Sequence, residues 1–354
     1  MTDVLLTARE RYALPILQPL ADALNAAGYR VSAWFDGPLA DAGERLPAPV
    51  NMLDTRGAVA LKPSAVFCAM DWIPPFFAGA KVQLFHGFNT NKHSDHRGHF
   101  RIRGLFDLYC TQGPATTLPF QALAAEQGHF AVVETGWSKL DPLFRDDGGA
   151  AERMRAHAGG RPVVMFASTF TERVSAAPHL IEAIQAEIAK GERYWLLTLH
   201  PKCPPELFAR YRALAGSNAL FVEPEQIVTA QRAADVLLSD TTSVVPEFVV
   251  QHKPVVTFRH RVPQSYMLDF SEQAQLPAML EQAFAPSAEL RQAIIAYANS
   301  IHPYRDGHSS ERVIQAVRDL QEGRLGVLRP KPFMTRIRSL QLRRRLGYWG
   351  PSAG

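Results

Sequence analysis

Cysteine is scarce in this chain, and long apolar runs are missing. The three cysteines lie far apart, so they match no metal-binding spacing, and their odd number is untypical of a disulfide-built secreted domain. No apolar run has the length of a transmembrane helix, and the first residues lack the basic region of a signal peptide. These absences predict a protein of the reducing cytoplasm.

Acidic residues are absent after Glu322. The chain has 38 basic and 34 acidic residues, and eight of the basic ones follow Glu322, which leaves 30 basic against 34 acidic, a net charge of −4, for the rest. A net acidic body lacks the broad positive surface that nucleic-acid-binding proteins use. The positive charge therefore belongs to a C-terminal tail, and no nucleic acid partner is expected.

Short apolar runs alternate with helical patterns through both halves of the chain. Most runs are apolar throughout rather than at every second position, which is typical of parallel strands covered on both faces. The pattern predicts strands at residues 4–8, 29–35, 65–69, 81–85, 105–110, 130–134, 162–167, 194–199, 220–222, 236–239 and 254–258. It predicts helices at residues 11–27, 176–190, 205–214, 227–233, 244–251, 289–300 and 309–321.

A glycine-rich segment, residues 146–162, interrupts the alternation and indicates a domain boundary. We expect an α/β protein with two doubly wound Rossmann-like domains facing a cleft, residues 1–150 and 161–322, followed by a basic tail, residues 323–354. Ligands of such sheets bind beyond the carboxyl ends of the strands. The polar residues at those ends are therefore the candidates for a site.

Four polar residues in a row follow the predicted strand 236–239 and precede a predicted helix. They are Asp240, Thr241, Thr242 and Ser243. A helix start with surplus hydroxyl groups favours an anion, because the unpaired N–H groups and the helix dipole both attract negative charge. The alternative is an ordinary N-cap, for which one such residue is enough.

Two histidines each follow a predicted strand directly. His86 precedes Gly87, which permits close backbone approach, and this position suits a general base, with a structural hydrogen bond to a loop as the alternative. His200 precedes Pro201, which ends the strand, and its imidazole is placed to donate to a phosphate oxygen or to serve only a structural role.

Thr169 and Arg173 follow the predicted strand 162–167, and a hydroxyl with a guanidinium suits a pyrophosphate as well as a solvated loop. A third group, His93, His96 and His99 around Asp95, has a spacing that raises the question of a metal site. The stretch contains Gly98 and no apolar face, so the sequence favours a polar loop. No metal ion is expected.

The tail contains apolar residues on two opposite helical faces. Phe333, Ile337 and Leu340 share one face, and Leu342 and Leu346 fall on the other, together with Trp349. Basic charge with aromatic residues suits an anionic membrane surface on the inner face of the cell membrane. The alternative is a tail that packs on its own domain.

Six short motifs in one order resemble those of the CDP-glycerol glycerophosphotransferase family, which includes enzymes of teichoic acid synthesis. The motifs are Phe85-His86-Gly87, Gly136-Trp137-Ser138-Lys139-Leu140-Asp141, Phe166-Ala167-Ser168-Thr169-Phe170, Leu199-His200-Pro201, Ser239-Asp240-Thr241-Thr242-Ser243 and Asp306-Gly307-His308-Ser309-Ser310-Glu311-Arg312. The chain departs from the family pattern at Ser138, Ser168 and Thr198, which affects the identity of the donor more than the fold.

The resemblance implies a GT-B fold, with a nucleotide donor in the C-terminal domain and an acceptor in the N-terminal one. It implies metal-independent transfer of a polyol phosphate from CDP-glycerol, or a related CDP-polyol, to a hydroxyl of a lipid-linked or polysaccharide acceptor. His86 becomes the candidate base. His200 and Thr241–Ser243 become candidates for holding the pyrophosphate and the CMP leaving group, and Ser309, Ser310 and Arg312 for a further phosphate contact. Gly136, Lys139 and Asp141 would form a structural turn.

Two other functions stay open. The segment 302–307 also resembles the non-hydrolysing UDP-N-acetylglucosamine 2-epimerases, although that family prefers Ser-Gly-Gly where this chain has Asp-Thr-Thr-Ser. A GT-B glycosyltransferase of capsule assembly that uses a nucleotide sugar is therefore one alternative. A non-catalytic binding module on the same fold is the other.

Overall fold

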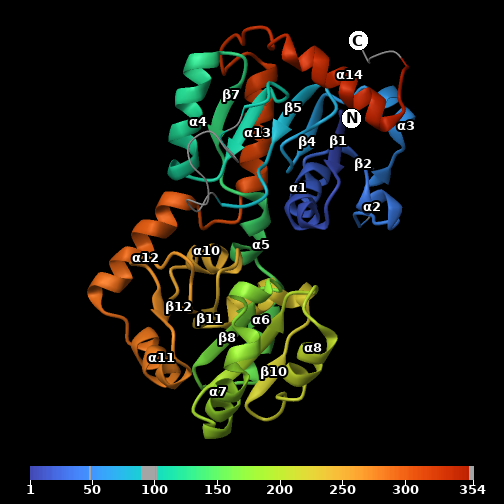
Figure 1. The fold of residues 1–354 in the computed structure, drawn as a ribbon. Coiled ribbons are helices and arrows are strands. Elements are labelled where there is room, and N and C mark those ends of the chain that lie inside the picture. Colours follow the sequence, from blue (N-terminus) through green and yellow to red (C-terminus); the bar gives the residue numbers. More distant parts are fainter. Residues whose placement is uncertain (48, 89–99, 101, 351–354) are drawn as a thin grey trace. The chain divides into compact units, whose positions relative to one another are not determined.

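The computed structural model describes residues 1–47, 49–88, 100 and 102–350. His93, His96 and His99 lie outside the described residues. The chain forms two compact units, each around its own sheet (Figure 1). The first unit contains Met1–Asp141 and Asp306–Gly354, and the second contains Pro142–Arg305.

The first unit is built on a parallel sheet in the order β3-β2-β1-β4-β5-β6-β7. Its strands are β1 (Asp3–Ala8), β2 (Arg30–Phe35), β3 (Asn51–Met52), β4 (Ala65–Cys68), β5 (Ala80–Gln83), β6 (Leu108–Thr111) and β7 (Ala131–Glu134). Its helices are α1 (Leu14–Ala26), α2 (Pro38–Asp41), α3 (Thr55–Leu61), α4 (Pro114–Gln127), α13 (Ser309–Gln321) and α14 (Met334–Leu346). Short 3-10 turns, η1 (Arg11–Ala13) and η2 (Ser138–Leu140), complete it.

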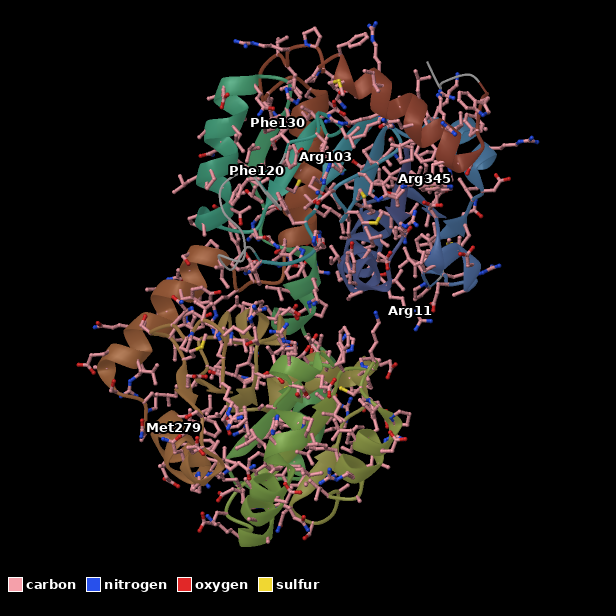
Figure 2. The ribbon with its side chains drawn as sticks, viewed as in Figure 1. Arg11, Arg103, Phe120, Phe130, Met279 and Arg345 are labelled. Atoms are coloured by element: carbon pink, nitrogen blue, oxygen red, sulfur yellow. The ribbon has the colours of Figure 1, made fainter. Side chains whose placement is uncertain are left out.

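Aromatic side chains fill the core on one face of this sheet. Tyr109 of β6 lies with its ring centroid 4.9 Å from those of Phe120 in α4 and Phe130 before β7, both labelled in Figure 2. Phe120 and Phe130 are almost fully buried. This aromatic cluster ties α4 to the strands, although the sequence pattern did not single out α4.

The second unit is built on a parallel sheet in the order β10-β9-β8-β11-β12-β13. Its strands are β8 (Val163–Ser168), β9 (Tyr194–Leu199), β10 (Ala219–Phe221), β11 (Val236–Ser239), β12 (Val255–Phe258) and β13 (Leu268–Phe270). Its helices are α6 (Ala150–Ala156), α7 (Ala177–Lys190), α8 (Pro205–Arg212), α9 (Ile227–Ala233), α10 (Val244–Val249), α11 (Leu276–Phe284) and α12 (Ala288–Ile301). Helix α5 (Asp141–Phe144) begins on the last residue of the first unit, and η3 (Glu172–Val174), η4 (Pro224–Gln226) and η5 (Gln273–Gln275) are 3-10 turns.

Successive residues of β8 belong to two different apolar cores. Val164 and Phe166 pack in the core that contains α7, α8 and α11, whereas Val163 and Met165 pack in the core of α6, α9, α10 and α12. Since both faces of the sheet are covered, the first five positions of the strand, residues 163–167, are all apolar. This confirms the interpretation of the continuous apolar runs as parallel strands.

The unit boundaries differ from those expected from the sequence. The first segment of the first unit ends at Asp141 rather than near residue 150. Residues 306–322, expected in the second domain, belong to the first unit. Helix α6 lies in the second unit because Ala151 and Met154 are buried in its core. The glycine-rich segment is therefore a turn on either side of α6.

Helix α13 belongs to the first unit for a physical reason. Its apolar face, with Val313, Ile314 and Val317, is buried, and the helix packs against α1. Arg318 on the same helix donates from Nε to the Tyr29 hydroxyl at 3.0 Å. The sequence pattern predicted the helix itself, but a short-range pattern contains no information on which sheet its apolar face covers.

Candidate functional site

The first candidate group surrounds His86, which lies shortly after β5. His86 is the third residue after β5, which ends at Gln83. Its Nδ1 lies 3.2 Å from the carbonyl oxygen of Ala69, which follows the adjacent strand β4. A carbonyl oxygen only accepts, so Nδ1 carries the proton of the neutral ring and Nε2 carries the lone pair. Tyr12, whose ring centroid is 5.3 Å away, covers the imidazole. The ring is thus held in the tautomer that a base acting through Nε2 needs.

The residue before His86 has an unusual backbone. Phe85 has a φ of 58°, in the left-handed region that a bulky residue rarely adopts. The Trp137 indole donates to the Phe85 carbonyl oxygen at 3.3 Å, and the Phe85 ring packs edge-on against Phe120 at 5.1 Å. Strained backbone held by its surroundings is common at functional sites. No residue type in the sequence indicated this strain.

The two glycines of this region have different roles. Gly136 has a φ of 79°, so the predicted structural turn needs a glycine there. A Cβ added at Gly87 would meet no described atom within 4 Å, and its φ is not in the positive range. The expected close backbone approach at Gly87 is therefore not found among the described residues. Instead, the Gly87 carbonyl accepts a hydrogen bond from Gln112 Nε2 at 3.1 Å.

The start of α13 is filled by a carboxylate of the chain itself. Asp141, only 1% exposed, accepts hydrogen bonds from the backbone N–H groups of Ser309 at 2.8 Å and Ser310 at 2.9 Å, and from Ser310 Oγ at 2.6 Å. Burial raises the pKa of Asp141, while these bonds favour its carboxylate form. The donors that we expected to hold a phosphate therefore bind Asp141.

Two basic residues of these motifs also have internal partners. Arg312 forms an ion pair with Asp306, six residues earlier, and its expected phosphate contact stays a prediction. Lys139 lies over the Trp137 ring, 5.3 Å from its centroid. The Asp306–Arg312 segment and the predicted 136–141 turn are joined by the hydrogen bonds of Asp141 to Ser309 and Ser310.

The second candidate group lies at the carboxyl ends of β9, β8, β11 and β12, which are neighbours in the second sheet. His200 follows β9, and its Nδ1 accepts a hydrogen bond from the backbone N–H of Lys202 at 3.1 Å. In the neutral ring the proton is therefore on Nε2, opposite to His86. Burial and the charge of Lys202 lower the pKa of His200. Phe170, which follows β8, packs against the imidazole with ring centroids 4.4 Å apart.

Asp240 is a buried carboxylate that forms hydrogen bonds at this edge of the sheet. Its side chain is fully buried and accepts hydrogen bonds from Ser168 Oγ at 2.5 Å, the Ala176 N–H at 2.9 Å and the Thr169 N–H at 3.1 Å. Burial raises the pKa of Asp240. A buried anion with these partners does not bind phosphate, so the structure corrects the prediction for Asp240. It positions the loop after β8 instead.

The three hydroxyl residues after Asp240 remain at the surface of the site. Helix α10 begins at Val244, as the sequence predicted, and Ser243 at its N-cap makes no side-chain capping bond. Thr241 Oγ1 accepts a hydrogen bond from the backbone N–H of Arg261 at 3.0 Å. Thr242 and Ser243 make no side-chain hydrogen bond within the described part of the chain.

Arg261 is a residue that the sequence analysis missed. It follows β12, the strand next to β11, and it is exposed. One residue before it, His260 accepts a hydrogen bond on Nδ1 from the Val262 N–H at 3.2 Å, which repeats the arrangement of His200. The Arg259-His260-Arg261 run directly after a strand was the available signal, and it brings positive charge beside Thr241.

Thr169 and Arg173 both lie in the loop after β8. The Thr169 N–H is bound to Asp240, which leaves its partly exposed side chain at the edge of the sheet. Arg173, in η3, is exposed and forms no ion pair among the described residues. The loop can therefore present a hydroxyl and a guanidinium beside the 241–243 hydroxyl groups.

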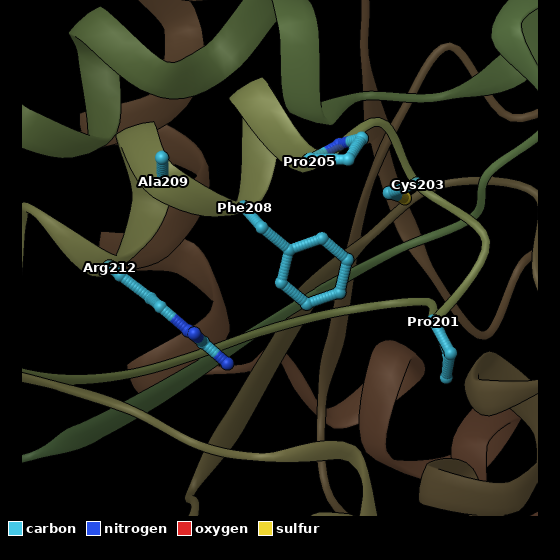
Figure 3. Close-up of a pocket in the computed structure, with 6 residues that line it drawn as sticks. All are labelled: Pro201, Cys203, Pro205, Phe208, Ala209 and Arg212. Carbon is cyan, nitrogen blue, oxygen red and sulfur yellow. The ribbon is translucent and has the colours of Figure 1, made fainter.

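A shallow pocket of about 400 Å³ lies next to the predicted turn at Pro201 (Figure 3). It is lined by Pro201, Cys203, Pro205, Phe208, Ala209 and Arg212. Arg212 is already paired with both carboxylate oxygens of Glu223 at 2.8 Å. Since its lining is mostly apolar and its one cation is paired, this pocket does not suit a phosphate.

Within the described residues, no group of three or more His, Cys, Asp or Glu side chains is arranged to hold a metal ion. Likewise, none of the described helices has the length and apolar character that crossing a bilayer requires.

Two doubly wound parallel sheets, each covered by helices, define the GT-B fold, as the sequence predicted. A structure of the wall teichoic acid polymerase TagF soaked with CDPG is similar to this chain, with a TM-score of 0.64 and 15% identity over 92% of this chain and 90% of that one. A second TagF structure gives a TM-score of 0.65 at 14% identity.

Nucleotide-sugar epimerases have the same fold. A putative UDP-N-acetylglucosamine 2-epimerase from Listeria monocytogenes has a TM-score of 0.62 at 15% identity and covers 94% of this chain and 99% of its own. The UDP-GlcNAc 2-epimerase from Neisseria meningitidis bound to UDP-GlcNAc has a TM-score of 0.60 at 14% identity over 90% of this chain. No protein-family model matches the sequence, and no curated protein matches it.

Proposed function

We propose that this protein is a transferase that moves a polyol phosphate, most simply glycerol phosphate, from a CDP-activated donor to an acceptor hydroxyl. The acceptor is a lipid-linked or polysaccharide chain of cell-surface polymer synthesis. The observation that carries the proposal is the opposite hydrogen bonding of two histidines: Ala69 O fixes the proton of His86 on Nδ1, and the Lys202 N–H fixes that of His200 on Nε2. One ring suits a base and the other a donor.

In the proposed reaction, His86 Nε2 takes the proton of the acceptor hydroxyl. The oxygen then attacks the phosphorus that carries the glycerol group, a new O–P bond forms, the bond to the CMP oxygen breaks, and CMP leaves. His200 Nε2–H donates to the donor phosphates, and the hydroxyls of Thr241, Thr242 and Ser243 surround them. Charge gathers on the leaving phosphate in the transition state, so fixed donors there lower the barrier.

Positive charge in the second unit supports an anionic donor. Arg173 follows β8 and Arg261 follows β12, the two strands that flank β11. Both are exposed, and neither forms a side-chain ion pair among the described residues. Guanidinium groups bind phosphate with paired, charge-assisted hydrogen bonds. We infer that these two arginines, with Thr169, replace the metal ion that many phosphoryl-transfer enzymes use, and that the reaction needs no metal.

The proposal is tested by an enzyme assay that measures the release of CMP. The purified full-length chain is incubated with CDP-glycerol or CDP-ribitol and an extract of lipid-linked acceptor, with and without a chelator. We expect acceptor-dependent CMP release that the chelator does not reduce. Release of UDP from a nucleotide sugar, with no CMP from either CDP-polyol, would contradict the donor assignment.

A nucleotide-sugar enzyme is the second candidate, because the epimerase structures match this chain about as closely as TagF does. In this chain, residues of the epimerase-like segment make contacts within the second unit. His302 is 2% exposed and stacks on Phe144, and Arg305 donates a hydrogen bond to the Gln251 carbonyl. The same assay with UDP-N-acetylglucosamine, followed for UDP release and for epimerisation, separates the two candidates.

A non-catalytic binding module is the third candidate. Under that hypothesis His86→Ala and His200→Ala leave the role of the protein in polymer assembly unchanged. Under the proposed reaction each substitution slows CMP release on the order of 10²-fold or more.

A further inference from the structure

Exposed large apolar side chains are concentrated in the C-terminal segment. Of the eleven in the described part of the chain, five lie between residues 327 and 349, including Phe333, Leu340 and Trp349. Singly scattered apolar residues on a surface need no explanation, but a local cluster indicates an interaction site. Met334 and Leu340 of these five lie on α14, which Figure 1 labels, and Phe333 is its N-cap residue.

One side of α14 is anchored on the first unit. Leu342 and Leu346 pack on the aromatic core below one face of the sheet, together with Tyr348. Thr335 Oγ1 donates to the Gly104 carbonyl at 2.9 Å, and Arg343 lies over the Phe76 ring, 4.4 Å from its centroid. Helix α14 is thus held in a defined orientation.

Basic residues beside this inner side form ion pairs and ring contacts with other residues of the first unit. Lys331 forms an ion pair with Asp107 at 2.8 Å. Arg345, labelled in Figure 2, pairs with Asp36 at 3.0 Å and lies 4.0 Å from the Trp72 ring centroid. These cations therefore stabilise the packing of the helix and are not available to a partner.

The opposite side, which we call the outer face, consists of Phe333, Arg336, Ile337, Leu340 and Arg344. These positions follow the i, i+3, i+4, i+7, i+11 spacing of one helical stripe. Phe333 is 70% exposed and Leu340 is 57% exposed. Neither Arg336 nor Arg344 has a side-chain partner among the described residues.

The two apolar stripes of the tail thus have different functions. The stripe of Leu342 and Leu346 packs on the protein, whereas Phe333 and Leu340 of the other stripe are exposed and Ile337 between them is half-buried. This explains why the apolar residues of the tail do not lie on one side. The alternative of a tail that packs on its own domain therefore holds for one side of the helix, and the other side is left exposed.

We propose that the outer face of α14 docks the protein on an anionic lipid surface. Phe333 and Leu340 would enter the headgroup region, and Arg336 and Arg344 would contact lipid phosphates. Charge complementarity favours lipid: no acidic residue follows Glu322, so nothing on this segment repels an anionic bilayer. Two free arginines beside an acidic body are too few for a nucleic acid surface. The proposal does not depend on the proposed function.

The test is co-sedimentation of the full-length chain with vesicles of phosphatidylcholine alone or with phosphatidylglycerol added. We expect binding to the anionic vesicles that weakens with salt. The double variant Phe333→Ser/Leu340→Ser removes the apolar contact with the bilayer, and the double variant Arg336→Gln/Arg344→Gln removes the charges that attract anionic lipid. Each should bind about tenfold more weakly or worse.

Matched controls come from exposed positions elsewhere. Leu118→Ser lies on α4 and Arg291→Gln on α12, and both should bind vesicles like the unchanged chain. Absence of binding to anionic vesicles at low salt, or equal binding by the outer-face variants, would overturn the proposal, as would binding of RNA or an acidic polymer in preference to vesicles. CMP release measured with a water-soluble acceptor should not change in the outer-face variants, which keeps this test separate from that of the proposed reaction.

Discussion

Ser168 donates a hydrogen bond from Oγ to Asp240 Oδ2 at 2.5 Å, across 72 residues of sequence. The bond connects the end of β8 to the turn after β11, and Asp240 also accepts from the N–H of Ala176, at the start of α7. Asp141 acts in the same way at the start of α13. In both units a buried carboxylate from a distant segment occupies a helix N-terminus.

Asp240→Ala should destabilise the protein by about 3 kcal/mol, because it leaves buried N–H and O–H groups without partners. The free energy of unfolding in urea measures this change. Thr242→Ala is the matched control: its side chain is partly exposed and makes no hydrogen bond in the described structure, so unfolding should change by less than about 0.5 kcal/mol. In the proposed reaction Thr242→Ala slows CMP release nonetheless. Equal stability of the two variants would show that Asp240 is not structural.

Ser310→Ala should destabilise the protein by about 1–2 kcal/mol, since Asp141 loses its 2.6 Å hydroxyl donor while buried. Gln315→Ala, on the exposed side of the same helix, should have almost no effect. Urea unfolding again gives the comparison. If Ser310 instead bound a phosphate of the donor, its removal would raise the KM for the donor and leave stability unchanged.

Glutamine substitution should distinguish the two histidines. A glutamine amide donates a hydrogen bond but does not accept a proton, so His200→Gln should keep CMP release within about tenfold while His200→Ala loses about 10²-fold. At position 86 both His86→Gln and His86→Ala should lose about 10²-fold or more, because a base is required. Rescue by glutamine at position 86 would exclude its role as a base.

Stability should fall as the pH drops below 6.5. Burial lowers the pKa of His129 and His252, and it lowers that of His200 together with Lys202. Below pH 6.5 the unfolded chain binds protons that the folded chain does not. The contribution of these histidines to the free energy of unfolding is therefore complete above pH 6.5, and it is lost as the pH falls through their lower pKa values in the folded state. Urea unfolding between pH 8 and pH 5.5 measures the slope, and His129→Gln should reduce it. A flat profile would contradict this account.

The order of the elements was predictable because it depends on local patterns. Residues 163–168 form a strand covered on both sides, and this requires a continuous apolar run that is visible in the sequence. The positions of His86, His200 and Thr241–Ser243 at strand ends followed from the same patterns. Their roles in a reaction remain predictions.

The partners of polar side chains were not predictable in this way. Asp141 and Ser310 are 169 residues apart, and Asp240 and Ser168 are 72 apart, so no local pattern connects them. Asp240 was assigned a phosphate, but it binds Ser168 and the N–H of Ala176. Asp141 was expected in a structural turn, without its partners being predicted. The strained φ of Phe85 also depends on packing by Trp137 and Phe120, which come from distant segments.

The sequence by itself determined the two parallel sheets, the strand ends that carry polar groups, and the separation of charge between body and tail, because periodicity and composition are local properties. Only the tertiary structure decided which helix ends are open to a ligand, which sheet α13 covers and which side of α14 faces outward. Those outcomes depend on hydrogen bonds and apolar contacts between residues far apart in the chain. They form only when the chain is folded.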